Sequence, residues 1–238
     1  MIVLALDTCD SRGSLAVLRD DAVLWSIAHE GAADYSSWVL PKAEEALNAS
    51  GLTMREADVI AVATGPGSFT GVRIGLTTVK AWSEAFGTAI AGVSRLQAVA
   101  SHAAAGTDLV ASFVDAHRDQ VFGGVYRKDG KELLLVEQEM VAAPAEFLDW
   151  VNQRSAGKRI AWISIDPEKM TTLELWREQE AAGERVESCP PVLAPAIGKI
   201  GRQRALAGLL TDALALDAEY VRRPDAELFW KGGPSRGS

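Results

Sequence analysis

The spacing of hydrophobic and polar residues predicts that strands and helices follow one another in a regular order from the first residue. Short apolar or alternating runs predict strands, and apolar residues recurring every three to four positions predict helices. In the first half of the chain, the expected elements are strands 1–7, 13–19 and 22–29, helix 36–50, strand 58–64, helix 70–86, strand 89–94 and helix 95–105. Three strands that lead into alternating helices and strands favour a sheet with antiparallel hairpins feeding parallel strands.

The same order begins again after residue 106. Segments 2–28 and 109–137 both contain a strand, an aspartate, a polar loop, a strand, a charged turn and a strand, so that Asp7 corresponds to Asp115. Later elements are expected at 144–153 (helix), 160–165 (strand), and near 171–182 and 195–210 (helices). Two such openings can resemble each other by chance, but the recurring aspartate favours a duplicated ribonuclease-H-like α/β lobe. The expected division is a lobe at 1–106, a lobe at 107–230 and a disordered tail at 231–238.

Two such lobes in tandem are typical of the actin, Hsp70 and sugar-kinase superfamily. In that superfamily, the first hairpin of each lobe places an aspartate near the phosphates of ATP. Here Asp7, Thr8, Ser11, Gly13 and Ser14 could form half of such a site. The second loop, 115–120, has no glycine, and its acidic groups would repel phosphate. Asp7 and Asp115 could still offer carboxylates to magnesium. The sequence therefore predicts vestigial phosphate loops with little ATP chemistry.

Composition narrows the possible functions. The chain has 238 residues, and its formal charge of −8 argues against a protein that grips nucleic acid alone, because phosphate binding relies on Lys and Arg. Two cysteines without a CxxC motif and three histidines without metal-ligand spacing predict no metal site. The sequence contains no apolar run of membrane-spanning length and does not begin like a signal peptide, so a cytoplasmic protein is expected.

The stretch Gly65-Pro66-Gly67-Ser68-Phe69-Thr70-Gly71 joins a predicted strand to a predicted helix, as phosphate-binding turns do. It lacks the Lys of a Walker loop, and its last glycine comes one residue late for a dinucleotide fingerprint. Ser68 also lacks the flanking glycines of a hydrolase nucleophile elbow. The remaining interpretation is a tight strand–helix turn, with Thr70 as the expected helix N-cap.

The two long helices of the first half carry more apolar surface than one sheet requires. Helix 70–86 has one apolar stripe of Val72, Leu76, Val79, Trp82 and Phe86, and a second of Ile74, Ala81 and Ala85. Helix 36–50 is expected to bury Val39, Leu40, Ala43, Ala46 and Leu47, with Trp38 opposite them beside Lys42. A helix on a sheet needs one such stripe, so a second stripe suggests contact with something else. Trp38 could anchor that interface or pack on its own chain.

Five segments together resemble the TsaB family, bacterial subunits of the machinery that makes threonylcarbamoyladenosine in tRNA. In chain order they are ALDTC, VLPKAEEAL, ATGPGSFTGVRIGLTTVKA, VDAHRDQVF and AEYVRRP. The resemblance covers most of the chain and is densest over residues 1–125. The chain departs from the family pattern at Cys9, where Ser is common, at Tyr35, where His is common, and at His117 and Phe122, where Arg and Tyr are usual.

The resemblance implies an accessory subunit with an actin-like fold and no catalytic residues of its own. Such a subunit pairs with its catalytic paralogue TsaD, works with the ATPase TsaE, contacts tRNA only indirectly and forms a homodimer when alone. It requires no cofactor, although ATP or ADP could bind at the interface with TsaD. The interface expected from the two helices and the glycine stretch comprises Trp38, Lys42, Gly65, Gly67, Ser68, Thr70, Gly71, Val72, Leu76 and Val79.

Two other functions stay open. An ATP-dependent phosphotransferase or ATPase of the same superfamily would bind nucleotide and depend on Asp7. An independent tRNA-binding module would bind tRNA by itself, with an affinity that falls steeply as salt rises.

Overall fold

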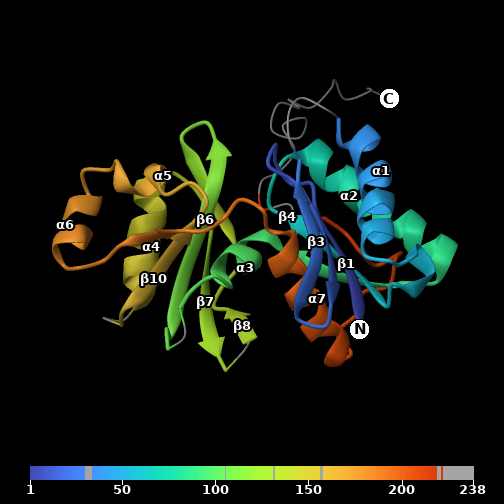
Figure 1. Cartoon of the computed structure of the whole chain (residues 1–238). Coiled ribbons are helices and arrows are strands. Elements are labelled where there is room, and N and C mark those ends of the chain that lie inside the picture. The colour runs from blue at the N-terminus through green and yellow to red at the C-terminus, as the bar shows by residue number, and fades with distance from the viewer. Residues whose placement is uncertain (30–33, 105, 131, 156–157, 219–220, 222–238) are drawn as a thin grey trace, which may run out of the picture.

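Two mixed sheets lie side by side and carry helices on their faces (Figure 1). The computed structural model describes residues 1–29, 34–104, 106–130, 132–155, 158–218 and 221. The first sheet contains β1 (Ile2–Asp7), β2 (Ser14–Arg19), β3 (Ala22–Ala28), β4 (Val59–Gly65) and β5 (Ala89–Ser94), in the order β3-β2-β1-β4-β5. β2 pairs antiparallel with β1 and β3, whereas β4 lies parallel to β1 and β5 parallel to β4. These strands confirm the predicted order.

The second sheet repeats this arrangement. It contains β6 (Leu109–His117), β7 (Gln120–Asp129), β8 (Glu132–Leu135), β10 (Ile160–Ser164) and β11 (Val186–Ser188), in the order β11-β10-β6-β7-β8, and β9 (Met140–Ala142) pairs with β7. β6 pairs antiparallel with β7 and parallel with β10, as β1 does with β2 and β4. β9 and β11 were not expected, because three residues are too few to create a periodic pattern. The lobe boundary near residue 106 stays a prediction, and the tail at 231–238 lies outside the described residues.

The helices follow the predicted pattern, with two differences. They are α1 (Tyr35–Ala49), the 3-10 turn η1 (Met54–Glu56), α2 (Phe69–Phe86), α3 (Arg95–Ala100), α4 (Pro144–Ser155), α5 (Glu168–Thr171), α6 (Trp176–Ala181) and α7 (Ala194–Leu206). The pattern at 171–182 corresponds to two short helices, because the Thr172 hydroxyl donates to the Glu168 carbonyl (2.7 Å) and competes with the backbone ladder. α3 ends at Ala100, where the Ser101 hydroxyl donates to the Ala98 carbonyl (2.7 Å).

One helix from each half of the chain packs on the sheet of the other half. α7 packs on β1, β2, β4 and β5 of the first sheet, so the helix predicted within the second lobe covers the first one instead. Gly201 permits this approach, because a Cβ there would lie 2.4 Å from the Cβ of Ala61. α3 follows β5 but packs on β6, where the Ser112 hydroxyl donates to the Leu96 carbonyl (3.0 Å). Periodicity shows that a helix is amphipathic, but not which sheet it covers.

The hydrophobic core extends through both sheets. Every residue of β4 is buried, as expected for a parallel strand covered on both faces. A second cluster in the β6–β10 sheet is built on aromatic edge-to-face contacts, with the rings of Trp162 and Trp176 centred 5.3 Å apart. Within the described part of the chain, no helix is long and apolar enough to cross a membrane.

Candidate functional site: an interlobe charge cluster and the outer face of two helices

The glycine stretch is a strand–helix turn whose cap differs from the predicted one. Ser68 has extended backbone angles, and its side chain accepts a hydrogen bond from the Gly71 N–H (3.4 Å). α2 therefore begins at Phe69, and the predicted N-cap Thr70 is wrong because it already lies in the first helical turn. Gly65, at the end of β4, has φ = 117°, a conformation that glycine adopts without strain.

Three glycines spaced by four residues let α2 press against the loop after β1. A Cβ would lie 2.2 Å from the Cys9 carbonyl oxygen at Gly67, 2.0 Å from the Thr8 carbonyl oxygen at Gly71, and 2.4 Å from Thr8 Oγ1 at Gly75. Gly71 and Gly75 lie four residues apart on one face of α2, so the first two turns of that face carry no side chain toward the loop. Thr8 Oγ1 uses this proximity to donate to the Gly71 carbonyl (2.7 Å). Gly67 and Gly71 thus face Thr8 and Cys9, in the loop after β1, rather than a partner.

Several residues of the expected partner interface are inside this chain. Val72, Leu76 and Val79 are buried in the core against the first sheet. Trp38 is also buried, with its ring centre 5.2 Å from that of His29 and 6.0 Å from that of Tyr35, so the expectation that it lies on the wet face is wrong. These side chains can position a surface, but they do not form one.

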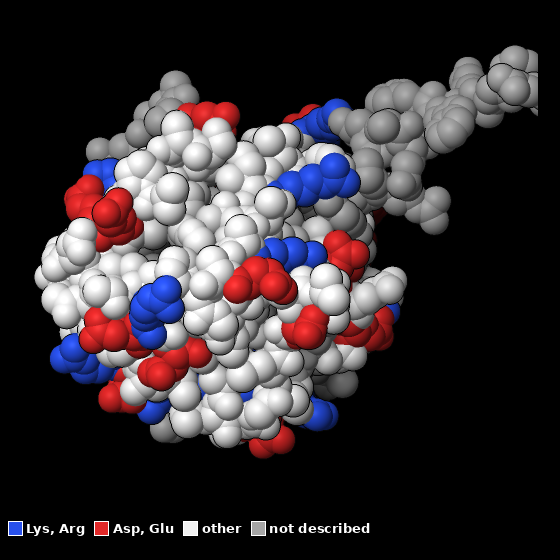
Figure 2. All heavy atoms as spheres, turned by 90° about the vertical axis from the view of Figure 1, so that its right-hand side faces the viewer, with Lys and Arg blue, Asp and Glu red and all other residues white. Residues whose placement is uncertain are grey.

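The exposed apolar residues of α1 and α2 form a different surface. Leu40, expected to be buried, is 60% exposed, and Phe69 and Phe86 are also exposed. A groove of about 320 Å³ runs between the helices and is lined by Leu40, Ala43, Glu44, Leu47, Asn48, Leu52, Thr53, Met54, Trp82 and Phe86. A second hollow of about 480 Å³ is lined by Ser36, Phe69, Thr70, Arg73, Ile74, Thr77 and Thr78. We call these two linings the outer face. Figure 2 looks onto this side of the molecule, where uncharged surface runs between acidic and basic side chains.

Two of the predicted interface residues remain accessible near the outer face. Ser68 and Thr70 are exposed, and Thr70 lines the second hollow. Lys42 is half-buried and forms an ion pair with Glu45 on the next turn of α1 (2.6 Å). Sequence periodicity placed Leu40 in the core because the helical wheel sets it beside Leu47, but the Leu40 side chain is exposed in the structure.

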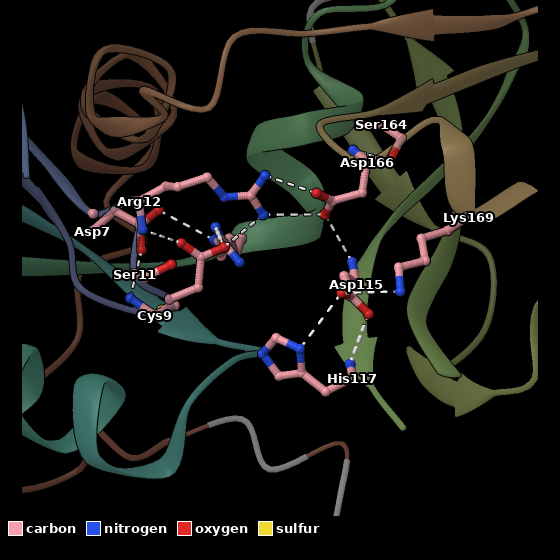
Figure 3. Close-up of polar contacts among 12 residues, drawn as sticks. Asp7, Cys9, Ser11, Arg12, Asp115, His117, Ser164, Asp166 and Lys169 are labelled. Carbon is pink, nitrogen blue, oxygen red and sulfur yellow. Dashed lines mark hydrogen bonds and ion pairs between the residues drawn. The ribbon is translucent and has the colours of Figure 1, made fainter. Parts of the chain in front are cut away.

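The aspartates predicted to lie near a phosphate site belong to a network of ion pairs between the sheets (Figure 3). Asp7, at the end of β1, is fully buried and accepts hydrogen bonds from the Cys9 N–H (2.9 Å) and from Arg95 Nε (3.2 Å). Arg95 is also buried, and its Nη2 contacts Asp10 Oδ2 at 2.5 Å. One guanidinium therefore contacts two carboxylates of the first loop.

Arg12 carries the network from the first sheet to the second. Its Nη1 and Nη2 donate to the two carboxylate oxygens of Asp166 at 2.7 and 3.2 Å, and Nη2 also contacts Asp10 at 3.0 Å. Asp166, just after β10, accepts the Asp115 N–H at 2.8 Å. Figure 3 shows the Arg12 side chain reaching across to Asp166. We call Asp7, Asp10, Arg12, Arg95, Asp115 and Asp166 the interlobe cluster.

In the second loop, residues 115–120, the Asp115 carboxylate contacts neighbouring groups of the same chain. Asp115 Oδ2 lies 3.2 Å from Lys169 Nζ and 3.5 Å from His117 Nδ1, and its other oxygen accepts the His117 N–H (2.8 Å). His117, Arg118 and Asp119 all have positive φ, between 53° and 59°. This conformation costs roughly 1–2 kcal/mol per residue for side chains other than glycine. The loop thus forms a strained tight turn in place of a glycine-rich phosphate loop.

The N–H groups of the first loop are also occupied. The Arg12 N–H donates to Asp10 Oδ1 (2.6 Å), and the Gly13 N–H donates to the Tyr35 hydroxyl (2.7 Å), which itself donates to the Asp10 carbonyl. Burial by itself would raise the pKa of Asp10, but the charge of Arg95 and the Arg12 N–H lower it overall. Burial raises the pKa of the Cys9 thiol, and the neighbouring Asp7 raises it further, so this cysteine is a poor nucleophile. Ser11 remains in the loop, with its carbonyl 3.3 Å from His29 Nδ1.

These loops do not fit a metal-bound nucleotide. Asp7 and Asp115, which were expected to offer carboxylates to magnesium, each contact a cation of their own chain, Arg95 and Lys169. Across the described segments, no group of three or more His, Cys, Asp or Glu side chains is arranged to hold a metal ion. The sequence reading missed Asp10, Arg12 and Asp166. A signal existed for Arg95, because it is the only charged residue in the apolar run GVSRLQAVA.

Comparisons with known proteins agree with the predicted fold. The family model of TsaD, described as tRNA N6-adenosine threonylcarbamoyltransferase, matches residues 28–183, well over half of the chain. The structure of YeaZ from Pseudomonas aeruginosa has a TM-score of 0.70 at 24% identity and covers 92% of this chain and 99% of that one. Component A of (R)-2-hydroxyglutaryl-CoA dehydratase from Acidaminococcus fermentans has a TM-score of 0.53 at 8% identity, covers 86% of this chain and 99% of that one, and so shows similarity of fold alone. The predicted α/β fold, with two mixed sheets of repeated strand order, is confirmed.

Sequence similarity extends along almost the whole chain. The tRNA threonylcarbamoyladenosine biosynthesis protein TsaB of Bacillus subtilis (strain 168) is 32% identical to it, over 97% of this chain and 98% of the relative. The chain therefore belongs to the TsaB family, within the wider group of proteins that the threonylcarbamoyltransferase family model describes.

Proposed function

We propose that this protein is a non-catalytic subunit in the biosynthesis of threonylcarbamoyladenosine next to the anticodon of tRNA, and that its outer face binds TsaD. The observation that carries this proposal is the exposed apolar surface of α1 and α2, centred on Leu40. Apolar surface of this kind, rimmed by charged side chains, is typical of protein interfaces. The match to the TsaD family model supports a partner of similar fold, whose equivalent helices could pack against these two.

The glycines support the interface from behind. Because Gly67, Gly71 and Gly75 bring α2 onto the Thr8–Cys9 loop, the helix is fixed on the sheet side and presents a rigid opposite face. Rigid elements lose little conformational entropy on binding, which favours affinity. Val72, Leu76, Val79 and Trp38 then act as positioning residues, and Leu40, Ile74, Thr77 and Phe86 as the proposed contacts.

The other members of the proposed assembly follow from the same family membership. TsaE would act on the complex with TsaD, tRNA would be bound chiefly by the partners, and the same outer face would support a homodimer of the chain when TsaD is absent. ATP or ADP, if it binds, would lie at the interface with TsaD. The protein would work in the cytoplasm. The ATPase alternative has less support, because the aspartates that it needs contact Arg95 and Lys169.

Light scattering coupled to size exclusion tests the proposal. Three samples are measured: the parent chain alone, the parent chain mixed with TsaD from the same organism, and the Leu40→Asp variant mixed with the same TsaD. A specific interface buries on the order of 1,200–2,000 Å², enough to survive dilution to micromolar concentration. We expect a stable complex with the parent chain and at least a tenfold weaker one with Leu40→Asp.

Leu175→Asp is the matched control. Leu175 is also an exposed leucine, at 50%, but it lies beside α6 at the opposite end of the molecule (Figure 1). It should leave complex formation unchanged. Equal binding by Leu40→Asp and the parent would place the interface elsewhere, and a parent chain that does not bind TsaD at all would remove the proposed function.

A further inference from the structure

The interlobe cluster contains charges buried too deeply to exist without partners. Asp7 is 0% exposed and Arg95 is 1% exposed. Taking a carboxylate or a guanidinium out of water costs several kcal/mol unless an opposite charge and hydrogen bonds replace the water. Asp7 receives both, from Arg95 and from the Cys9 N–H. A cation at this position is therefore required by the fold.

Local structure does not explain why that cation is Arg95. The residue opens α3, directly after the N-cap Ser94, where the helix dipole disfavours positive charge. Its neighbours Leu96, Ala98 and Val99 are fully buried apolar residues. The two carboxylates of Asp7 and Asp10 are the groups that stabilise it there.

The cluster holds more carboxylates than guanidinium groups. Arg95 and Arg12 carry two positive charges against the four carboxylates of Asp7, Asp10, Asp115 and Asp166. Lys169 pairs with Asp115, and the Asp115 N–H donates to Asp166. The two guanidinium groups make four contacts with the carboxylate oxygens of Asp10 and Asp166, so their positive charge is already shared among carboxylates of the chain. Added nucleotide phosphates would bring further negative charge into a cluster that already holds a surplus of it.

The cluster also joins the two sheets. Arg12 lies in the loop between β1 and β2, and Asp166 follows β10, 154 residues further along the chain. Their contact uses both nitrogens and both oxygens, the bidentate geometry that is the strongest form of this ion pair.

We propose that Arg95 is a resident cation that occupies the place of a divalent metal ion between Asp7 and Asp10, and that Arg12 uses the same cluster as a latch that holds the two sheets together without nucleotide. The ion pairs that connect the two sheets are made by side chains of this chain itself. The proposal concerns the free chain and does not depend on the partner.

Chemical rescue tests the first part. Arg95→Ala removes the guanidinium and leaves two carboxylates beside an empty volume, a setting that suits an oxygen-liganded divalent cation. Thermal unfolding is followed for the parent and the variant with and without millimolar MgCl2 or MnCl2. A ligand that binds only the folded state raises Tm. We expect the metal to raise the Tm of Arg95→Ala by about 3 °C or more and to leave the parent unchanged.

The double variant Arg95→Ala/Asp7→Asn is the control, because it keeps the cavity but removes one carboxylate. It should lose the metal response. A folded Arg95→Ala chain that ignores both metals, or a parent that responds as strongly as the variant, would overturn the resident-cation proposal.

Arg12→Ala tests the latch and is expected to fold, since this side chain is 37% exposed. Hydrogen exchange is compared in peptides covering residues 109–117 and 160–169. We expect at least tenfold faster exchange at the Asp115 amide, whose acceptor Asp166 loses its partner. Arg202→Ala is the control, because it removes an ion pair between α7 and Asp21, in the turn between β2 and β3 of the first sheet. It should leave the exchange rates of these peptides unchanged. Unchanged exchange in Arg12→Ala would overturn the latch. This test uses a different variant, so it can be carried out even if Arg95→Ala does not fold.

Discussion

In the interlobe cluster, carboxylates, guanidinium groups and backbone N–H groups bind one another, whereas on the outer face apolar side chains remain exposed to water. Asp7, Asp10 and Asp166 each contact an arginine of the same chain. Leu40 and Phe86 have about 60% and 37% of their surface exposed beside a groove of about 320 Å³. The polar groups of the loops after β1 and β10 thus bind one another within the chain, whereas apolar side chains of the first two helices stay exposed.

The two regions are connected through the Thr8–Cys9 loop. This loop follows Asp7 on one side and contacts the bare glycine face of α2 on the other. The comparison teaches that one short loop can join a buried polar network on one side and position a helix on the other.

The largest effect is expected where the loop meets α2. Gly71→Ala places a Cβ 2.0 Å from the Thr8 carbonyl oxygen, which is backbone and cannot turn away. Alanine gains about 1 kcal/mol in helix propensity, but overpacking should outweigh it and destabilise the fold by about 2–3 kcal/mol in net. Urea unfolding measures the difference.

Thr77→Ala is the control on the opposite face of the same helix. It also introduces an alanine, but at an exposed position, and should change the free energy of unfolding by less than about 0.5 kcal/mol. If both variants were equally stable, the glycine face would not be closely packed.

Ala81→Glu tests the outer side of α2 independently of α1. Ala81 is exposed, so the charge should leave the free energy of unfolding unchanged while it disfavours the proposed apolar contact with TsaD. We expect about a tenfold weaker complex, which corresponds to about 1.4 kcal/mol. Titration by calorimetry measures the affinity. A variant that binds TsaD as tightly as the parent would confine the interface to α1.

Tyr35→Phe weakens the first loop without touching its charges. The hydroxyl accepts the Gly13 N–H and donates to the Asp10 carbonyl, so its loss leaves two backbone groups without a partner. We expect a loss of about 1–2 kcal/mol in the free energy of unfolding. No loss in urea unfolding would mean that water reaches this loop and replaces the hydroxyl.

The smallest expected effect is on how thermal stability depends on pH at the Asp10 carboxylate. The pKa of Asp10 is lower in the folded protein, so this carboxylate stabilises the fold above its unfolded pKa of about 4. That contribution is lost as the pH falls below this value through the folded pKa. Asp10→Asn should lower Tm at neutral pH and make the fall of Tm between about pH 5 and pH 3 shallower. Parallel Tm curves for the variant and the parent would contradict the assignment.

Sequence reasoning recovered the order of the strands because their apolar runs are short, strong and bounded by turns. It also placed Asp7 and Asp115 at equivalent strand ends. It could not show that α7 covers the first sheet, because an amphipathic helix carries no information on its destination. It took Leu40 for a core residue because the helical wheel sets Leu40 beside Leu47. It left open whether Trp38 anchors an interface or packs on its own chain, and in the structure Trp38 packs on its own chain. Arg12 and Asp166 meet only in the fold, across 154 positions of sequence.

Hydrogen exchange on the parent chain, alone, with TsaD and with Mg-ATP, tests the central claim most directly. Exchange is followed over α1 and α2 and over the interlobe loops at residues 7–13, 94–96 and 115–119. The account predicts that TsaD protects the exposed residues of α1 and α2, and that Mg-ATP by itself changes no interlobe loop. Protection of those loops by Mg-ATP, with no protection of α1 and α2 by TsaD, would contradict it.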